Sequence, residues 1–261
     1  MLKGNARSPD APQSPLDRID TVWFHGAGLG GDTWATLTTR HPRARTPDLP
    51  GHHAAPLTGE ARVEAFADAL DSNVVPGAVL IGHSLGGMVA LELAARRASD
   101  VRGLVLIEAV PTIRDRLAGR VAAVLAKTLF SAIPKPWLAA LTAFGQSSET
   151  KDMLHRQITR MHKSGLNAAL QASARYDGRP RLKQVTAPTL VIVGDKNTAT
   201  HRGATLMAEG IENAQIVTLP GGHMLHTDNP LGLKRCIEDF LLQRVLTDTP
   251  SSREEQDPAL K

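Results

Sequence analysis

The chain has 261 residues, of which 42% are hydrophobic, which is enough for one substantial buried core. Its 30 Lys and Arg exceed its 26 Asp and Glu only slightly, and no basic run of the kind that binds nucleic acid occurs. No apolar run approaches the roughly 20 residues that a membrane-spanning helix needs, and the single cysteine cannot form an internal disulfide.

Both ends of the chain are polar. Residues 1–17 and 246–261 cannot bury enough apolar surface to offset the entropy lost on ordering, so we expect both to be mobile tails. The N-terminal stretch carries prolines and charges where a secretory signal peptide needs an apolar segment. We therefore expect a cytoplasmic protein with no membrane span.

Between the tails, short apolar segments alternate with helical patterns. The segments are continuously apolar, as strands covered by helices on both faces are. They comprise residues 21–24, 78–81, 103–107, 189–193 and 215–219. Apolar residues recur at helical spacing in residues 63–70 and 233–241. This alternation predicts an α/β fold with a mostly parallel, doubly wound sheet.

The alternation stops between residues 111 and 181, where only helical patterns occur. We expect this segment to be a helical lid inserted over the carboxyl edge of the sheet; an ordinary helical extension of the core is the alternative. The core would then comprise residues 18–110 and 182–245. The insertion contains apolar residues at helical spacing and several aromatic residues. They are Leu117, Val121, Val124, Leu125, Phe130, Trp137, Phe144, Leu154, Ile158 and Met161.

The strongest chemical signal is the segment GHSLG at residues 82–86, which stands between an apolar strand and a helical pattern. A serine at a sharp strand-to-helix turn needs small residues two positions before and after it, because the backbone there is strained. Such a turn lifts the hydroxyl of Ser84 clear of the sheet and places a helix N-terminus beneath a developing oxyanion. Ser84 is therefore predicted to be a nucleophile.

This segment resembles the nucleophile elbow of the α/β-hydrolase superfamily, and the resemblance extends over about residues 19–245. It includes FHGAGLGGDTW (24–34), DLPGHH (48–53), APTLVIVGDKN (187–197) and LPGGHMLHTDNP (219–230), in the family's order. The resemblance implies an α/β-hydrolase fold, with Ser84 as nucleophile and His223, rather than His226, as the base. It also implies that the backbone N–H groups of Ala27 and Leu85 form an oxyanion hole.

The third member of the triad departs from the family pattern. The usual acid stands three residues after the glycine that closes the fourth predicted strand, and Asn197 occupies that position. Two carboxylates are alternatives. Glu108 ends the third predicted strand, where haloalkane dehalogenases of the superfamily carry their acid, and Asp195 lies two residues before Asn197. We place Glu108 first and keep Asp195 and Asn197 as alternatives.

These residues predict acyl transfer to Ser84 from a small carboxylic ester, thioester or lactone with an apolar acyl part. Residues 175–195 resemble those of small bacterial esterases and enol-lactone hydrolases. A lyase or C–C bond hydrolase on the same scaffold, and a non-catalytic ligand-binding protein, stay open as alternatives. We expect no cofactor and no metal, because the adjacent His52 and His53 lack a third ligand and no phosphate-loop pattern occurs.

Overall fold

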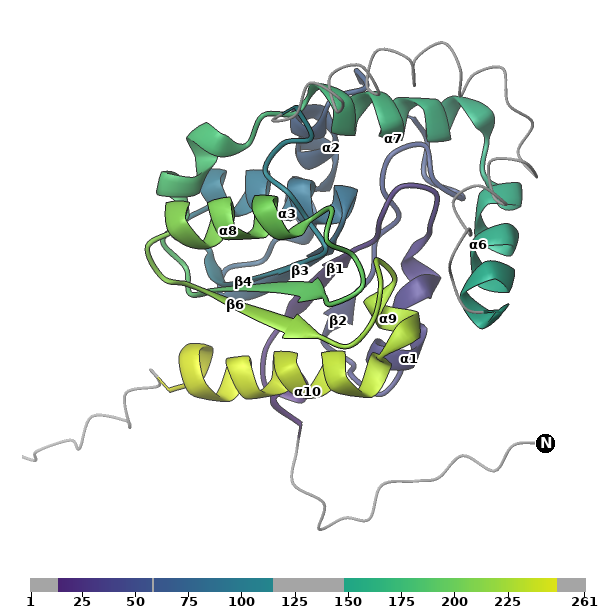
Figure 1. Cartoon of the computed structure of the whole chain (residues 1–261). Coiled ribbons are helices and arrows are strands. Elements are labelled where there is room, and N and C mark those ends of the chain that lie inside the picture. Colours follow the sequence, from purple (N-terminus) through teal and green to yellow (C-terminus); the bar gives the residue numbers. More distant parts are fainter. Residues whose placement is uncertain (1–13, 58, 115–147, 248–261) are drawn as a thin grey trace, which may run out of the picture.

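The structure is a computed structural model that describes residues 14–57, 59–114 and 148–247. A parallel sheet of six strands runs through this part of the chain, in the order β2-β1-β3-β4-β5-β6 (Figure 1). The strands are β1 (Thr21–Phe24), β2 (Ala44–Arg45), β3 (Ala78–His83), β4 (Val101–Ile107), β5 (Thr189–Gly194) and β6 (Ala214–Leu219).

All five predicted strands and their parallel pairing are confirmed. The edge strand β2 was not predicted, because its two residues, Ala44 and Arg45, include no apolar run. Every residue of β1, β3 and β5 is buried, as the continuously apolar segments indicated.

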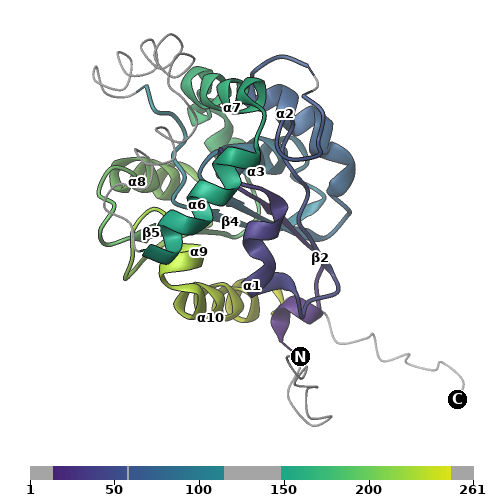
Figure 2. The same ribbon diagram turned by 90° about the vertical axis from the view of Figure 1, so that its right-hand side faces the viewer.

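Helices cover both faces of the sheet, so the doubly wound arrangement is confirmed (Figures 1 and 2). One face carries α2 (Val63–Leu70), α3 (Leu85–Arg96) and α8 (His201–Gly210), and the other carries α1 (Ala35–Thr38) and α10 (Pro230–Phe240). The remaining helical segments are η1 (Pro15–Asp17), η2 (Gly31–Trp34), η3 (Asp71–Asn73), α6 (Ser148–Arg160), α7 (Lys163–Arg175), η4 (Arg179–Gln184), α9 (Leu225–Asp228) and η5 (Leu241–Val245).

The core lies in two layers, one on each face of the sheet. Along β3, Leu80 joins the apolar cluster under α2 and α3, whereas Val79 and Ile81 join the cluster under α10. This alternation follows from the opposite orientation of successive side chains in a strand. Among the described residues, no helix is both long and apolar enough to cross a lipid bilayer.

The N-terminal boundary of the core lies earlier than expected. Pro15–Asp17, which lie in the stretch expected to be a tail, form the short helix η1, and Ser14 caps it. Leu16 is completely buried, and the Asp17 carboxylate lies 2.7 Å from Nδ1 of His41. At the other end, Leu246 packs partly buried against the core. Residues 1–13 and 248–261 lie outside the described part of the chain.

The expected insertion contains two described helices, α6 and α7, and residues 115–147 lie outside the described part. The apolar face predicted around Leu154, Ile158 and Met161 is buried. Helix α7 touches the loop of residues 48–53 with its backbone, since a Cβ on Gly165 would stand 1.8 Å from the carbonyl oxygen of Gly51. The function of these helices as a lid stays a prediction.

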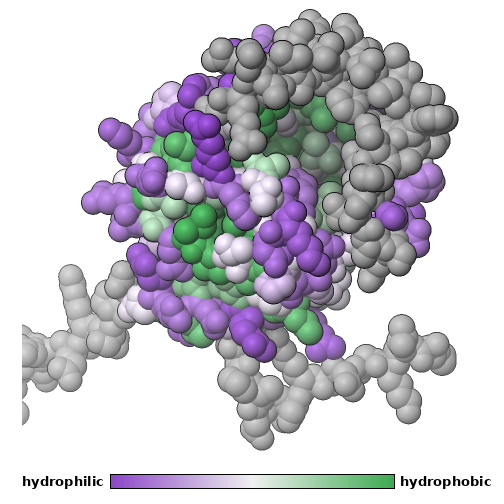
Figure 3. Space-filling view, viewed as in Figure 1, coloured by the Kyte–Doolittle hydropathy of each residue, from purple (hydrophilic) through white to green (hydrophobic). Residues whose placement is uncertain are grey.

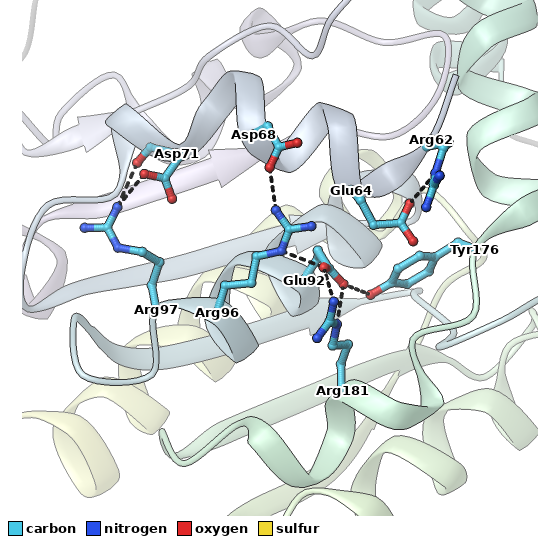
Figure 4. Close-up of polar contacts among 9 residues, drawn as sticks. All are labelled: Arg62, Glu64, Asp68, Asp71, Glu92, Arg96, Arg97, Tyr176 and Arg181. Carbon is cyan, nitrogen blue, oxygen red and sulfur yellow. Dashed lines mark hydrogen bonds and ion pairs between the residues drawn. The ribbon is translucent and has the colours of Figure 1, made fainter. Parts of the chain in front are cut away.

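A buried carboxylate joins the insertion to the helix that follows Ser84 (Figure 4). Glu92 of α3 is 1% exposed and accepts hydrogen bonds from Arg96 Nε (2.7 Å), Arg181 Nε (3.0 Å) and the hydroxyl of Tyr176 (3.1 Å). Arg96 also pairs with Asp68 of α2 at 2.5 Å. Burial and the neighbouring Glu92 raise the pKa of the Tyr176 hydroxyl, so it stays a donor.

We expect Glu92→Ala to lower the free energy of unfolding by about 2 kcal/mol, because it leaves two guanidinium groups and a hydroxyl without their shared acceptor. Asp68→Ala, which removes a largely exposed partner of the same Arg96, is the matched control, with an expected loss below about 1 kcal/mol. Urea unfolding measures both variants. Equal losses would show that burial of Glu92 adds nothing to the network.

Candidate active site

The turn between β3 and α3 has the strained backbone that the GHSLG segment predicts. Ser84 adopts φ 54° and ψ −117°, a conformation that residues with a side chain rarely adopt. A Cβ on Gly82 would stand 2.3 Å from the carbonyl oxygen of Gly86, and a Cβ on Gly86 would stand 2.2 Å from that of Phe24. The turn can therefore close only if both positions are glycine.

The neighbouring strand β4 is directly followed by a second residue of this kind. Glu108 has φ 50° and is 1% exposed. The strands are in register, since the Ser84 N–H donates to the carbonyl of Ile107 at 3.0 Å and the Glu108 N–H donates to that of Ile192 at 2.8 Å. Strained non-glycine residues concentrate at functional sites. Here Ser84 and Glu108 directly follow adjacent strands at the carboxyl edge of the sheet.

The carboxylate of Glu108 lies beside the imidazole of His223. Its Oε2 atom is 3.3 Å from His223 Nδ1 and accepts hydrogen bonds from Asn197 Nδ2 (2.5 Å) and Thr200 Oγ1 (2.8 Å), while Oε1 accepts from the N–H of Gly194. Burial raises the pKa of this carboxyl, but the hydrogen bonds from His223, Gly194 and Thr200 outweigh burial and hold the pKa below its usual value. Glu108 is therefore ionised at neutral pH.

The other two candidates for the acid have different surroundings. Asn197 is close to the base, with Nδ2 at 3.1 Å from His223 Nδ1, but the same amide nitrogen donates to Glu108. Asp195 is exposed, and its Oδ1 accepts from the N–H of Gly221 at 2.9 Å. The structure thus brings Glu108 and Asn197 to the imidazole. The Asp195 carboxylate instead accepts a hydrogen bond from the backbone of the loop that precedes His223.

The expected oxyanion donors lie on the two sides of Ser84. Leu85 is the first residue of α3. The loop that contains Ala27 passes close to Ser84, since a Cβ on the adjacent Gly26 would stand 3.4 Å from Ser84 Cβ. Within the described residues, neither the Ala27 N–H nor the Leu85 N–H donates to a protein acceptor.

Two buried histidines support the Ala27 loop. His25 Nε2 accepts from the Leu49 N–H at 3.0 Å, so its Nδ1 donates to the carbonyl of Gly26 at 2.9 Å, and His52 Nε2 accepts from the Gly28 N–H at 3.3 Å. Burial lowers the pKa of His25 well below 6.5 and that of His52 to about 4. Both rings are therefore neutral, and their hydrogen bonds hold the backbone of the loop.

Comparison with known proteins identifies the family. The sequence profile described as "Alpha/beta hydrolase family" matches residues 21–233. The chain belongs to this family.

Curated relatives and solved structures agree with the family assignment. The chain is 34% identical over 200 residues to pimeloyl-[acyl-carrier protein] methyl ester esterase of Aromatoleum aromaticum, covering 69% of this chain and 80% of the relative. It is 30% identical over 258 residues to the magnesium-chelatase 30 kDa subunit of Rhodobacter capsulatus, covering 87% and 88%. The crystal structure of the enol-lactonase from Burkholderia xenovorans LB400 has a TM-score of 0.73 at 22% identity, covering 86% and 92%.

In this alpha/beta hydrolase, apolar side chains from three segments meet next to the site. Leu29, Leu154 of α6 and Met224 form one buried cluster, so the neighbours of the Ala27 loop and of His223 both contact the insertion. A Cβ on Gly28 would lie 3.3 Å from Ile158 of α6. Figure 3 shows hydrophobic surface, coloured green, among the described residues on this side of the molecule.

Some contacts of the site had no sequence signal. The ring of His53 lies 2.7 Å from Gln157 Oε1 of α6, and Gln157 Nε2 donates to Asp32 at 2.7 Å. Asp228 accepts from the Gly222 N–H, directly before His223. Gln157 belongs to no segment with a family resemblance, and the pattern around Asp228 does not name its backbone partner, so only the folded chain reveals these contacts.

Proposed function

We propose that the protein hydrolyses a carboxylic ester, thioester or lactone, with Ser84 as nucleophile, His223 as base and Glu108 as acid. The observation that supports this most strongly is the contact of 3.3 Å between Glu108 Oε2 and His223 Nδ1, at the sheet edge where the strained Ser84 turn also stands. The triad is recognised by geometry and role rather than by position in the sequence.

In the first step the Ser84 hydroxyl attacks the carbonyl carbon while His223 Nε2 takes its proton. Glu108 accepts the Nδ1–H of the ring and stabilises the imidazolium. The N–H groups of Ala27 and Leu85 hydrogen-bond to the oxyanion, and one such donor contributes roughly 3 kcal/mol to the transition state. His223 then protonates the leaving alcohol or thiol. Water, deprotonated by His223, releases the acid and regenerates Ser84.

Glu108 is the proposed acid because its carboxylate is ionised and lies close to the ring. An amide in this role stabilises an imidazolium poorly, and an Asp→Asn change in a serine protease lowers turnover by about 10⁴-fold. Asn197 instead donates to Glu108 and holds it against the ring. The family's usual acid position is thus taken by a residue that supports an acid on the next strand.

The proposed substrate is a small ester with an apolar acyl part. Two observations support it: the buried cluster of Leu29, Leu154 and Met224, and a relative whose name states that it acts on a methyl ester. The chemistry of a lyase or C–C bond hydrolase would use the same serine and histidine, and trapping of an acyl-enzyme distinguishes hydrolysis through Ser84 from it.

We expect the wild-type protein to hydrolyse p-nitrophenyl acetate and butyrate, and Ser84→Ala to lower kcat by about 10⁵-fold or more, because the nucleophile and its proton are removed together. A fluorophosphonate reagent should add one label per wild-type chain and none to S84A, as intact-mass spectrometry measures. Thr33→Ala, which leaves the triad unchanged, is the control. Turnover by S84A at the wild-type rate would refute the covalent mechanism, and a wild-type protein that is inert and unlabelled would support a binding function.

A further inference from the structure

The loop that carries His223 contains two consecutive glycines. It consists of Pro220-Gly221-Gly222, and Gly221 has φ 145°, a value that residues with a side chain rarely adopt. Two consecutive glycines have many accessible backbone conformations. An imidazole at the end of such a loop keeps one position only if groups outside the loop fix the loop's backbone.

Three side chains from other parts of the chain hold successive main-chain groups of this loop. Asp195 Oδ1 accepts from the Gly221 N–H at 2.9 Å, Asp228 Oδ2 accepts from the Gly222 N–H at 2.8 Å, and His83 Nε2 lies 2.8 Å from the carbonyl oxygen of His223. These contacts come from the loop after β5, from helix α9 and from the residue before Ser84.

The contact with His83 is the most buried of the three. A carbonyl oxygen can only accept, so His83 Nε2 carries the proton and Nδ1 is the bare nitrogen. Burial, followed by the neighbouring His223 and His226, lowers the pKa of His83 well below 6.5, so the ring is neutral. Its centroid lies 4.9 Å from that of the His223 ring. His83 therefore contacts both the backbone and the ring of the proposed base.

The carboxylates of Asp195 and Asp228 each accept a hydrogen bond from a backbone N–H of the loop. Main-chain hydrogen bonds also join the segment of Asp195 to the loop of His223, since the Asp195 N–H donates to the Leu219 carbonyl at 2.9 Å and the Lys196 N–H donates to the Gly221 carbonyl at 3.0 Å. Asp228 accepts a further hydrogen bond from Thr150 of α6 at 3.1 Å, which connects the loop to the insertion. An amide oxygen could accept from the same N–H groups, so these contacts require an acceptor and not a negative charge.

We propose that His83, Asp195 and Asp228 are positioning residues that clamp the backbone of residues 221–223 and so fix the imidazole of His223 between Glu108 and Ser84. The inference rests on the proposed function and adds residues to it that touch no substrate. It also gives Asp195, an alternative acid from the sequence, a different role.

The test compares variants that delete each contact with variants that preserve it. His83→Phe, Asp195→Ala and Asp228→Ala delete the hydrogen bond, whereas His83→Gln, Asp195→Asn and Asp228→Asn retain a donor or an acceptor. We expect the deleting variants to lower kcat for p-nitrophenyl butyrate by about 10- to 100-fold with KM within twofold, because a misplaced base slows the chemical step alone. The retaining variants should stay within threefold of wild type.

A second readout needs no turnover. In protein labelled with ¹⁵N-histidine, the ring signals of His223, assigned by comparison with His223→Gln, should be single in wild type and in the retaining variants, and broadened or split in the deleting ones. This separates the clamp from the catalytic proposal. If wild type is inert but the signals follow this pattern, the proposed function fails and the clamp stands.

Two results would overturn the clamp. One is a set of deleting variants with wild-type kcat and a single His223 ring signal. The other is an Asp195→Asn or Asp228→Asn variant as impaired as its alanine counterpart, which would assign that residue a charged role. The melting temperature of each variant is measured as well, to show that the variant is folded. Asp195 and Asp228 are exposed, so their alanine variants test the clamp even where His83→Phe is unstable.

Discussion

Replacing Glu108 with Gln is expected to lower kcat for ester hydrolysis by about 10³- to 10⁴-fold, with a much smaller effect on KM. The amide would keep the size of the side chain, but it would lose the charge that stabilises the His223 imidazolium. Because Oε2 also accepts from Asn197 and Thr200, an amide nitrogen at that position would face two donors. Steady-state kinetics with p-nitrophenyl butyrate measure the loss.

The double variant Glu108→Gln/Asn197→Asp tests whether an acid at the family's usual position can take over. Position 197 already places a side-chain atom 3.1 Å from His223 Nδ1, so a carboxylate there should recover at least tenfold of the activity lost in the single variant. Asp195→Asn is the matched control and should stay near wild type. Full activity in Glu108→Gln, together with loss in Asp195→Asn, would assign the acid to Asp195 instead.

The second large effect is a loss of stability in mild acid. Four histidines are buried in neutral form, and burial is the first cause of the lowered pKa of each: to about 4 for His52 and His226, and well below 6.5 for His25 and His83. In the unfolded chain these rings titrate near pH 6.5. Between the two values the unfolded state binds more protons, so stability rises with pH.

The contribution of these groups is therefore complete above about pH 6.5 and decreases as the pH falls toward 4. A shift of about 2.5 pKa units corresponds to roughly 3 kcal/mol for each of His52 and His226, which together approach the whole stability of many domains. We expect the urea midpoint to fall steeply between pH 6.5 and 4. The lowered pKa of Glu108 acts in the same direction but only below its unfolded value of 4.5.

Urea titrations at a series of pH values measure this dependence. His226→Gln, which keeps a partner for Thr33, should give a shallower curve over this interval, because one titrating group is removed. His155→Gln removes an exposed histidine of α6 and should leave the curve unchanged. A flat stability profile from pH 7 to 4.5 would contradict the neutral buried state of these rings.

The sequence predicted the parts of the molecule that depend on short-range patterns. The turn at Ser84 needs glycine at fixed offsets, and the central strands are continuously apolar, so both were visible without a structure. Glu108 came first among the candidate acids because it ends the strand beside the Ser84 turn, where some members of the superfamily carry their acid, and the structure does place it beside His223.

Other features depend on pairs of residues far apart in the chain. The partners of Glu92 come from its own helix and from the segment after α7, and the contact between His53 and Gln157 joins a loop to the insertion. No local pattern selects such pairs, because their side chains meet only after the sheet has assembled. The two-residue strand β2 was missed for a related reason: its pairing with β1 defines it, and its composition does not.

Ser84 and Glu108 follow adjacent strands that are hydrogen-bonded to each other, in the register that pairs His83 with Ile107. Their spacing is consequently a property of the sheet and does not depend on any loop. The imidazole of His223, by contrast, follows two consecutive glycines in a loop. Ligands that distort the site should therefore displace His223 and leave the proposed nucleophile and the proposed acid in place. Over evolutionary time, insertions between β4 and β5 could lengthen or shrink without separating this pair.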